Sequence, residues 1–284
     1  MKILKQALFI SLALLLAAGS SLAQQEAPAG DEYVQQAESG AVNWGSYTVT
    51  ATGVGAPPAN AVNAAQARGM AKRAATVIAR RNLLELIKGV QIDSSTTVEN
   101  FMVSSDVVVS QIRGFLQNSQ ILDTAYMSDG SVEVSVGLKL GGSIADVVLP
   151  KADRFKLQAP AAMPKPVQQV PGAYSGLVVD ARGLGVRPAM SPRILDEAGN
   201  ELYGTAMVSR EYAIQQGMAG YAKDPDKAAA NPRVASNPMT VAAIGVLGAS
   251  RSDLVIPTAK ADEIRAQTES KDYLAQARVM ILLD

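Results

Sequence analysis

The first regular pattern in the chain is a strand that begins near Ser46. Tyr47, Val49 and Ala51 alternate with threonines, and this period of two is typical of a strand with one buried face. The sequence Gly53-Val54-Gly55 predicts a turn at its end.

A hairpin is predicted further along, with strands over 120–127 and 131–140 joined by Asp129-Gly130, a common hairpin dipeptide. Apolar residues in the second of these strands recur at every other position: Val132, Val134, Val136, Leu138 and Leu140. One face of this sheet is therefore expected to be buried and the other to face water.

A long helix is predicted over 62–88, with Gly89 as its C-terminal cap residue. On an ideal helix, one sector about 120° wide is expected to face the core. It contains Met70, Ala74, Val77, Ile78 and Leu84. Arg81 lies in the middle of this sector, so we expect it to extend outward or to pair with Glu85 or Asp93. The basic residues of the helix point in many directions, which disfavours a nucleic-acid or membrane recognition helix.

The segment between this helix and the hairpin predicts a strand over 90–98 and a short helix over 105–116. Residues 159–171 contain four prolines and no periodicity, so we place a linker over 151–171. These features divide the mature chain into a flexible leader over 24–43, a module over 44–150 and a second domain over 172–284.

The second domain is predicted to be α+β as well. Its strands are expected over 175–180, 240–247, 253–256 and 277–283. A helix over 258–267 is expected to begin at Thr258. Residues 221–238 are predicted to form a long irregular loop.

The first residues predict export. Lys2 and Lys5 precede an apolar run over 7–18, and Ser21 and Ala23 are small residues that suit cleavage after Ala23. The longest later apolar run, over 239–249, is too short for a transmembrane helix. We therefore expect the mature protein in the periplasm or at the periphery of the outer membrane.

Composition narrows the chemistry. The chain contains no cysteine and no histidine, which excludes disulfides, Ser-His-Asp catalysis and metal sites built on imidazole or thiolate. Lysine plus arginine and aspartate plus glutamate both number 26, and only 5% of residues are aromatic, so nucleic acid is not an expected partner. We expect neither enzymatic activity nor a cofactor.

Two weak motifs do not change this interpretation. Gly183-Leu184-Gly185 lacks the remaining residues of a phosphate-binding loop, and Pro188 prevents a helix from following, so a turn is expected. Asp224 and Asp226 lack the further ligands of a calcium loop.

The stretch from Tyr47 to Leu140 resembles a known family. The ordered segments are "ATGVG", "AAQARGMAKRAATVIARRNLLELIKGV" and "DGSVEVSVGLKL". Together, over about residues 46–140, they resemble the LPP-type twenty-kilodalton outer-membrane lipoproteins, which include FlgP and are similar to the N-terminal domain of FlgT. The matching positions are Ala74, Ala75, Arg81, Asn82, Leu83, Gly89, Val90, Thr97, Asp106 and Gly114.

This resemblance implies an α+β module in which a long helix packs on a small, mainly antiparallel sheet. It also implies a structural or assembly role in the Gram-negative envelope, in some members as discs or rings of the flagellar motor, and brings no catalytic residues. The implied partners are envelope or flagellar proteins and further copies of the chain. Candidate structural or interface residues are Arg81, Asn82, Glu85 and Asp93.

The chain departs from the family in one respect, because Gln24 stands where the lipid-bearing cysteine would be. Attachment to the outer membrane is therefore expected to be peripheral. The alternative function is a periplasmic module that binds a small molecule or partner between its two domains, with the proline-rich linker as a hinge.

Overall fold

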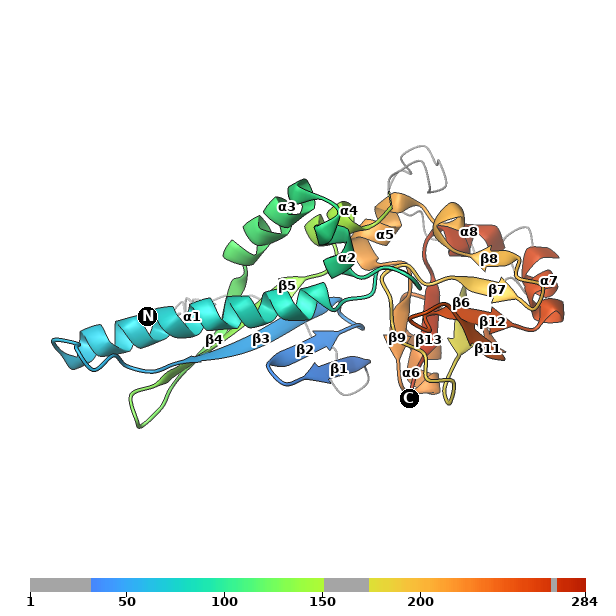
Figure 1. Cartoon of the computed structure of the whole chain (residues 1–284). Coiled ribbons are helices and arrows are strands. Elements are labelled where there is room, and N and C mark those ends of the chain that lie inside the picture. The colour runs from blue at the N-terminus through green and yellow to red at the C-terminus, as the bar shows by residue number, and fades with distance from the viewer. Residues whose placement is uncertain (1–31, 151–173, 267–269) are drawn as a thin grey trace, which may run out of the picture. The chain divides into compact units, whose positions relative to one another are not determined.

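The computed structural model describes residues 32–150, 174–266 and 270–284, and it is a mixed α+β structure, as the sequence predicts (Figure 1). The predicted signal peptide over 1–23 and the predicted linker over 151–171 lie outside the described residues. We call residues 32–150 the N-terminal module and residues 174–284 the second domain.

The N-terminal module contains a five-stranded sheet in which every neighbouring pair of strands is antiparallel. The long helix α1 (Ala64–Lys88) lies along this sheet (Figure 1). In sheet order the strands are β1 (Val34–Ala37), β2 (Gly40–Asn43), β3 (Thr48–Gly55), β5 (Val132–Lys139) and β4 (Gln120–Tyr126). The expected arrangement of a long helix on a small antiparallel sheet is confirmed.

The flexible leader expected over 24–43 is ordered in its last part, where β1 and β2 form a hairpin that extends the sheet beyond β3. β1 is an edge strand, and Gln35, Gln36 and Ala37 are exposed to water. Because an edge strand needs few apolar side chains, its polar sequence resembled that of a disordered leader.

Helix α1 buries a different stripe from the predicted one. Its buried residues are spaced four apart and fully inaccessible: Ala71, Ala75, Ala79, Leu83 and Ile87. Met70 and Val77, which were predicted to face the core, are 45% and 56% exposed. The helix therefore turns its small side chains toward the sheet and leaves part of its larger apolar ones in water.

The reason lies in β3, where Gly53 and Gly55 belong to the strand and do not form the predicted turn. A Cβ atom on Gly53 would lie 2.3 Å from the backbone nitrogen of Ala79, and one on Gly55 would lie 2.2 Å from the carbonyl oxygen of Ala71. The two glycines thus let the helix and strand backbones approach closely, and only alanines fit between them.

This close approach leads to a prediction. Gly53→Ala is expected to lower the free energy of unfolding by about 2–3 kcal/mol, because the new methyl group meets backbone atoms that cannot rotate away. Gly69, on α1, has no atom within 4 Å of its potential Cβ. Gly69→Ala is therefore the control, and it is expected to stabilise the helix by about 1 kcal/mol. Urea unfolding measures both, and equal midpoints for Gly53→Ala and the unmodified chain would contradict the packing argument.

In the N-terminal module, three short helices follow α1, two before the β4–β5 hairpin and one after it, and the strand predicted over 90–98 is wrong. Its residues form a loop in which the Asp93 carboxylate accepts hydrogen bonds from the backbone of Ser95 and Thr96, at 2.8 and 2.9 Å. This local bonding replaces a strand ladder. The helices are α2 (Val98–Val103), α3 (Asp106–Gln117), which was predicted, and α4 (Ser143–Val148).

The second domain contains two four-stranded sheets, with the strand orders β10-β6-β13-β9 and β11-β12-β7-β8. Three predicted strands are confirmed as β6 (Gly176–Asp180), β12 (Asp253–Ile256) and β13 (Val279–Leu282). The other strands are β7 (Ile194–Asp196), β8 (Glu201–Tyr203), β9 (Gly220–Ala222), β10 (Pro238–Ala242) and β11 (Gly245–Leu247). The helices are α5 (Arg210–Gln216), α6 (Pro225–Ala230), the predicted α7 (Thr258–Ala266) and α8 (Ser270–Ala275), with a 3₁₀ turn over Thr205–Met207.

Two predictions for this domain need correction. The strand predicted over 240–247 is divided, because β10 and β11 belong to different sheets. The loop predicted over 221–238 contains α6, in which Asp224 caps the first turn by accepting a hydrogen bond of 2.9 Å from the Lys227 backbone. Pro225 at the first helical position suits this start.

Candidate functional site

The predicted site residues lie on and just after α1, and the structure gives them different roles. Arg81 is exposed, and it makes no hydrogen bond or ion pair with another residue of the part that the structure describes. The predicted pairing with Glu85 is wrong, because the Glu85 carboxylate binds the Lys88 ammonium at 2.9 Å. Arg81 faces water because the buried stripe of α1 lies elsewhere on the helix.

Asn82 joins α1 to the sheet. Its side-chain nitrogen donates a hydrogen bond of 2.7 Å to the backbone carbonyl of Thr52 in β3. Asparagine has a low intrinsic preference for the interior of a helix. The hydrogen bond to Thr52 offsets this cost by linking the helix to the sheet.

Asp93 lies where the N-terminal module meets the second domain. Its backbone carbonyl accepts a hydrogen bond of 3.2 Å from the Ser250 hydroxyl, and the carbonyl of Ser94 accepts one of 3.1 Å from the Ser250 backbone. The backbone of Met190 donates to the carbonyl of Gln91 in the same loop, at 2.9 Å. The loop that Asp93 organises is therefore a contact with the second domain of the same chain.

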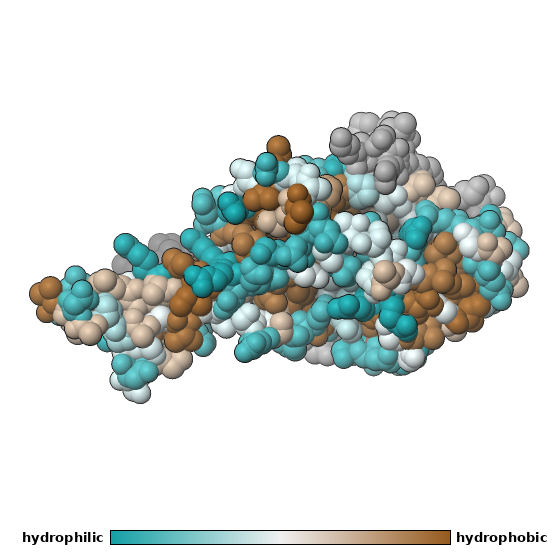
Figure 2. Space-filling view, viewed as in Figure 1, coloured by the Kyte–Doolittle hydropathy of each residue, from teal (hydrophilic) through white to brown (hydrophobic). Residues whose placement is uncertain are grey.

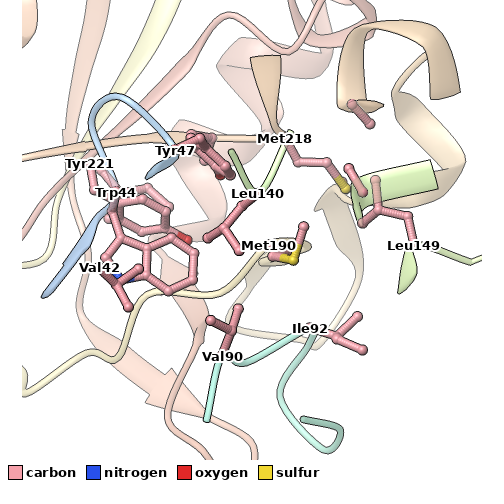
Figure 3. Close-up of a cluster of buried hydrophobic side chains, with 14 of the residues drawn as sticks. Val42, Trp44, Tyr47, Val90, Ile92, Leu140, Leu149, Met190, Met218 and Tyr221 are labelled. Carbon is pink, nitrogen blue, oxygen red and sulfur yellow. The ribbon is translucent and has the colours of Figure 1, made fainter. Parts of the chain in front are cut away.

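The centre of this contact is an aromatic cluster, which we call the junction (Figure 3). Trp44 is 1% exposed, and its ring meets those of Tyr47 and Tyr221 edge-on, with centroids 5.9 and 5.6 Å away. Apolar side chains from both parts of the chain surround it: Val42, Val90, Ile92, Leu140, Leu149, Met190 and Met218.

The tyrosine hydroxyls of the junction are all satisfied by backbone groups. Tyr47 donates to the carbonyl of Ala219 at 2.7 Å, and Tyr221 donates to that of Ala189 at 2.7 Å. Tyr203 belongs to the same buried cluster, so we include it in the junction, and it donates to the carbonyl of Met218. Since the Tyr47 bond joins the module to the second domain, the junction is fixed by directional contacts as well as by burial.

Burial also controls the ionisation of these groups. It raises the pKa of Tyr47 to about 12, although the positive charge of Arg233 and the bond to Ala219 oppose this rise. Burial likewise raises the pKa of Tyr203 and Tyr221 above the usual tyrosine value. These neutral, hydrogen-bonded phenols stabilise the packing, and none is placed as an acid or base for chemistry.

The sequence patterns did not identify the junction. Trp44 is the first residue of the predicted module, which starts at residue 44, and Tyr47 was predicted as an ordinary strand residue. A usable signal was the position of Trp44, the chain's only tryptophan, close to Tyr47 in a chain with few aromatic residues. Large aromatic residues often carry much of the packing energy of a contact.

A different feature lies at the free side of the module's sheet, where β4 is the last strand. Four large apolar side chains on or directly after β4 are 44–55% exposed, and we call them the β4 edge: Ile121, Leu122, Tyr126 and Met127. Arg68 of α1 lies over the Tyr126 ring, 5.6 Å from its centroid. Figure 2 shows one face of the molecule, on which apolar side chains are exposed at several places among hydrophilic ones.

The chain has no histidine or cysteine, so a metal site would need a cluster of aspartates and glutamates. Within the described ranges, no group of three such carboxylates could hold a metal ion. Within the same ranges, no helix is both long and apolar enough to cross a membrane. Three features could therefore carry a function: the packed junction, the apolar β4 edge and a groove on the module's sheet.

A family model matches part of the chain. Residues 176–284 match the family model described as the second domain of Treponema pallidum Tp0624. The match begins at the first residue of β6 and spans the second domain, so this part of the chain is similar to a unit that occurs as a second domain elsewhere. No curated protein matches the chain.

Proposed function

We propose that this chain is a non-enzymatic structural protein of the Gram-negative cell envelope that assembles through its β4 edge. The observation that carries the proposal is an edge strand with four exposed, large apolar side chains. An edge strand also presents backbone N–H and C=O groups that a further strand can pair with. Most soluble proteins protect such an edge with charges or cover it, so an apolar one favours association.

Two further observations support this function. The segment from Tyr47 to Leu140 resembles a family of envelope lipoproteins, and its expected helix-on-sheet arrangement is present. The second domain packs on the module through the junction. In the module's sheet, β1 is the strand at one edge and β4 is the strand at the opposite edge, so the β4 edge stays available. We propose copies of this chain and envelope or flagellar proteins as the partners, with peripheral attachment at the outer membrane.

The alternative, a periplasmic module that binds a ligand between its two domains, finds less support. The space where such a site would lie is occupied by Trp44, Tyr47 and Tyr221, which are 5% exposed or less. A hinge needs a contact that can open, whereas this one is buried and hydrogen-bonded.

The assembly proposal is tested with the double variant Ile121→Lys/Tyr126→Lys. Lysines on an edge strand must keep their charge in water, so they oppose pairing. We expect the unmodified mature chain to form oligomers in sedimentation velocity, and the variant to need at least about tenfold higher concentration to do so.

The matched control is Val103→Lys/Val107→Lys. These valines of α2 and α3 are 85% and 67% exposed, so the control adds the same charge at apolar positions away from the β4 edge. It is expected to assemble like the unmodified chain. A strictly monomeric unmodified chain, or equal loss of assembly in both variants, would overturn the proposal.

A further inference from the structure

A groove of about 410 Å³ lies on the face of the module's sheet opposite α1. Thr50 of β3 and its partner Gly137 of β5 form part of its floor, because Val49 and Ala51 point to the other face and are buried there. The last turn of α3 contributes Phe115 to the wall. This volume falls within the range of about 300–1,000 Å³ that is usual for sites that hold small molecules.

The lining is largely apolar. Phe115, Leu122 and Ile144 contribute side chains from three different elements. Gly137 has no side chain, and Leu122 leans across it, with its Cδ1 atom 2.7 Å from the position that a Cβ of Gly137 would take. A side chain at Gly137 would therefore displace Leu122 and change the groove.

The charge in the groove is positive. Lys139 is the one charged side chain among the described residues that line it, and it is exposed at the end of β5. Within the described ranges, its ammonium makes no ion pair or hydrogen bond. Polar residues such as Asn118, Gln120 and Ser143 also line the groove, but most of its surface is apolar. A mainly apolar groove that contains an unpaired cation favours an apolar molecule with a negative head group.

We propose that this groove binds a free, single-chain amphiphile with a carboxylate head group. The chain lies against Phe115, Leu122 and Ile144, and the carboxylate lies beside the Lys139 ammonium. Hydroxyl groups such as that of Thr50 stay available to water or to the ligand. Leu122 belongs to both the groove and the β4 edge, whereas Ile121 and Tyr126, the residues changed in the assembly test, do not line the groove.

The test is isothermal titration calorimetry of the full mature chain with dodecanoate, below the concentration at which micelles form. Saturable binding of one dodecanoate per chain is expected, with weaker binding of dodecanol and none of dodecyltrimethylammonium. Lys139→Gln is expected to weaken dodecanoate binding by roughly two- to fivefold, as for an exposed ion pair, and to leave dodecanol binding unchanged. Lys72→Gln, on α1 at the opposite face, is the charge-matched control.

A second pair of variants tests the place of binding. Thr50→Trp puts a large ring into the groove and is expected to weaken dodecanoate binding by at least about tenfold. Thr52→Trp makes the same change on the same strand face, at a position that does not line the groove, and is expected to bind as before. Both are compatible with a strand, which accommodates aromatic residues well.

Several outcomes would overturn the proposal. These are no saturable dodecanoate binding, unchanged binding by Thr50→Trp, and equal affinity for all three ligands together with no effect of Lys139→Gln. Sedimentation with phosphatidylglycerol vesicles in the absence of dodecanoate binding would point to a membrane surface and would also overturn it. Ile121→Lys/Tyr126→Lys is expected to bind dodecanoate normally, so failure of the assembly proposal would not affect this result.

Discussion

Trp44→Ala is expected to lower the free energy of unfolding of the whole chain by about 3–5 kcal/mol. The indole ring is 1% exposed and contacts Tyr47 and Tyr221, so its removal leaves a cavity at the centre of the junction. The surrounding groups are held by hydrogen bonds such as that from Tyr47 to Ala219, which limit how far they can move to fill it.

Guanidinium unfolding followed by far-UV circular dichroism measures this effect. Trp44→Phe is the control, because it keeps an aromatic ring in the site and should lose less stability. In the unmodified chain, the fluorescence of Trp44, the only tryptophan, reports on the junction itself. An unchanged denaturation midpoint for Trp44→Ala would show that the junction contributes little to stability.

The same measurement distinguishes a rigid junction from a hinge. With the two parts held by a shared core, tryptophan fluorescence and circular dichroism should follow one cooperative transition. A hinge would let fluorescence change first, at lower denaturant concentration, while most helix and strand signal remained. A rigid junction favours assembly through the β4 edge, because a rigid chain presents a defined surface to the next copy.

The parts of the fold that the sequence predicted correctly are those set by local chemistry. The β4–β5 hairpin follows from Asp129-Gly130 and the alternating valines after it. Helix α7 follows from Thr258 after a proline, and β12 has the predicted bounds. Each of these signals acts within a few residues, so a sequence pattern is enough to find it.

The parts that the sequence did not predict depend on a distant partner. The buried stripe of α1 is decided by Gly53 and Gly55, which favour alanines over the larger apolar side chains that a helical wheel selects. For the same reason Arg81 extends outward, which was one of its two expected outcomes, and does not pair with Glu85 or Asp93. Tyr47 and Ala219 are 172 positions apart, and no periodicity within either segment relates them. Asn82, a position that matches the resembled family, and Asp93, which was considered as a partner for Arg81, both make structural contacts.

Alkaline solution is expected to destabilise the chain steeply between about pH 10 and pH 12. A tyrosine phenol is neutral when protonated, and burial raises the pKa of Tyr47 from 10.0 to about 12 in the folded chain. Below pH 10 both states hold the proton, so the stability contributed by this burial is fully present. Above pH 10 the unfolded chain loses the proton first, and stability falls by about 1.4 kcal/mol per pH unit for each such group.

Burial moves the pKa of Tyr203 and Tyr221 in the same direction, so their losses add to that of Tyr47 over this range. Urea unfolding at a series of pH values gives the slope, and phenolate absorbance shows when the tyrosines ionise. Tyr47→Phe should reduce the slope by the share of one tyrosine. If all phenolate absorbance appeared near pH 10 in a chain that stayed folded, the tyrosines of the junction could not be buried as described, since ionisation inside it would require the packing to open.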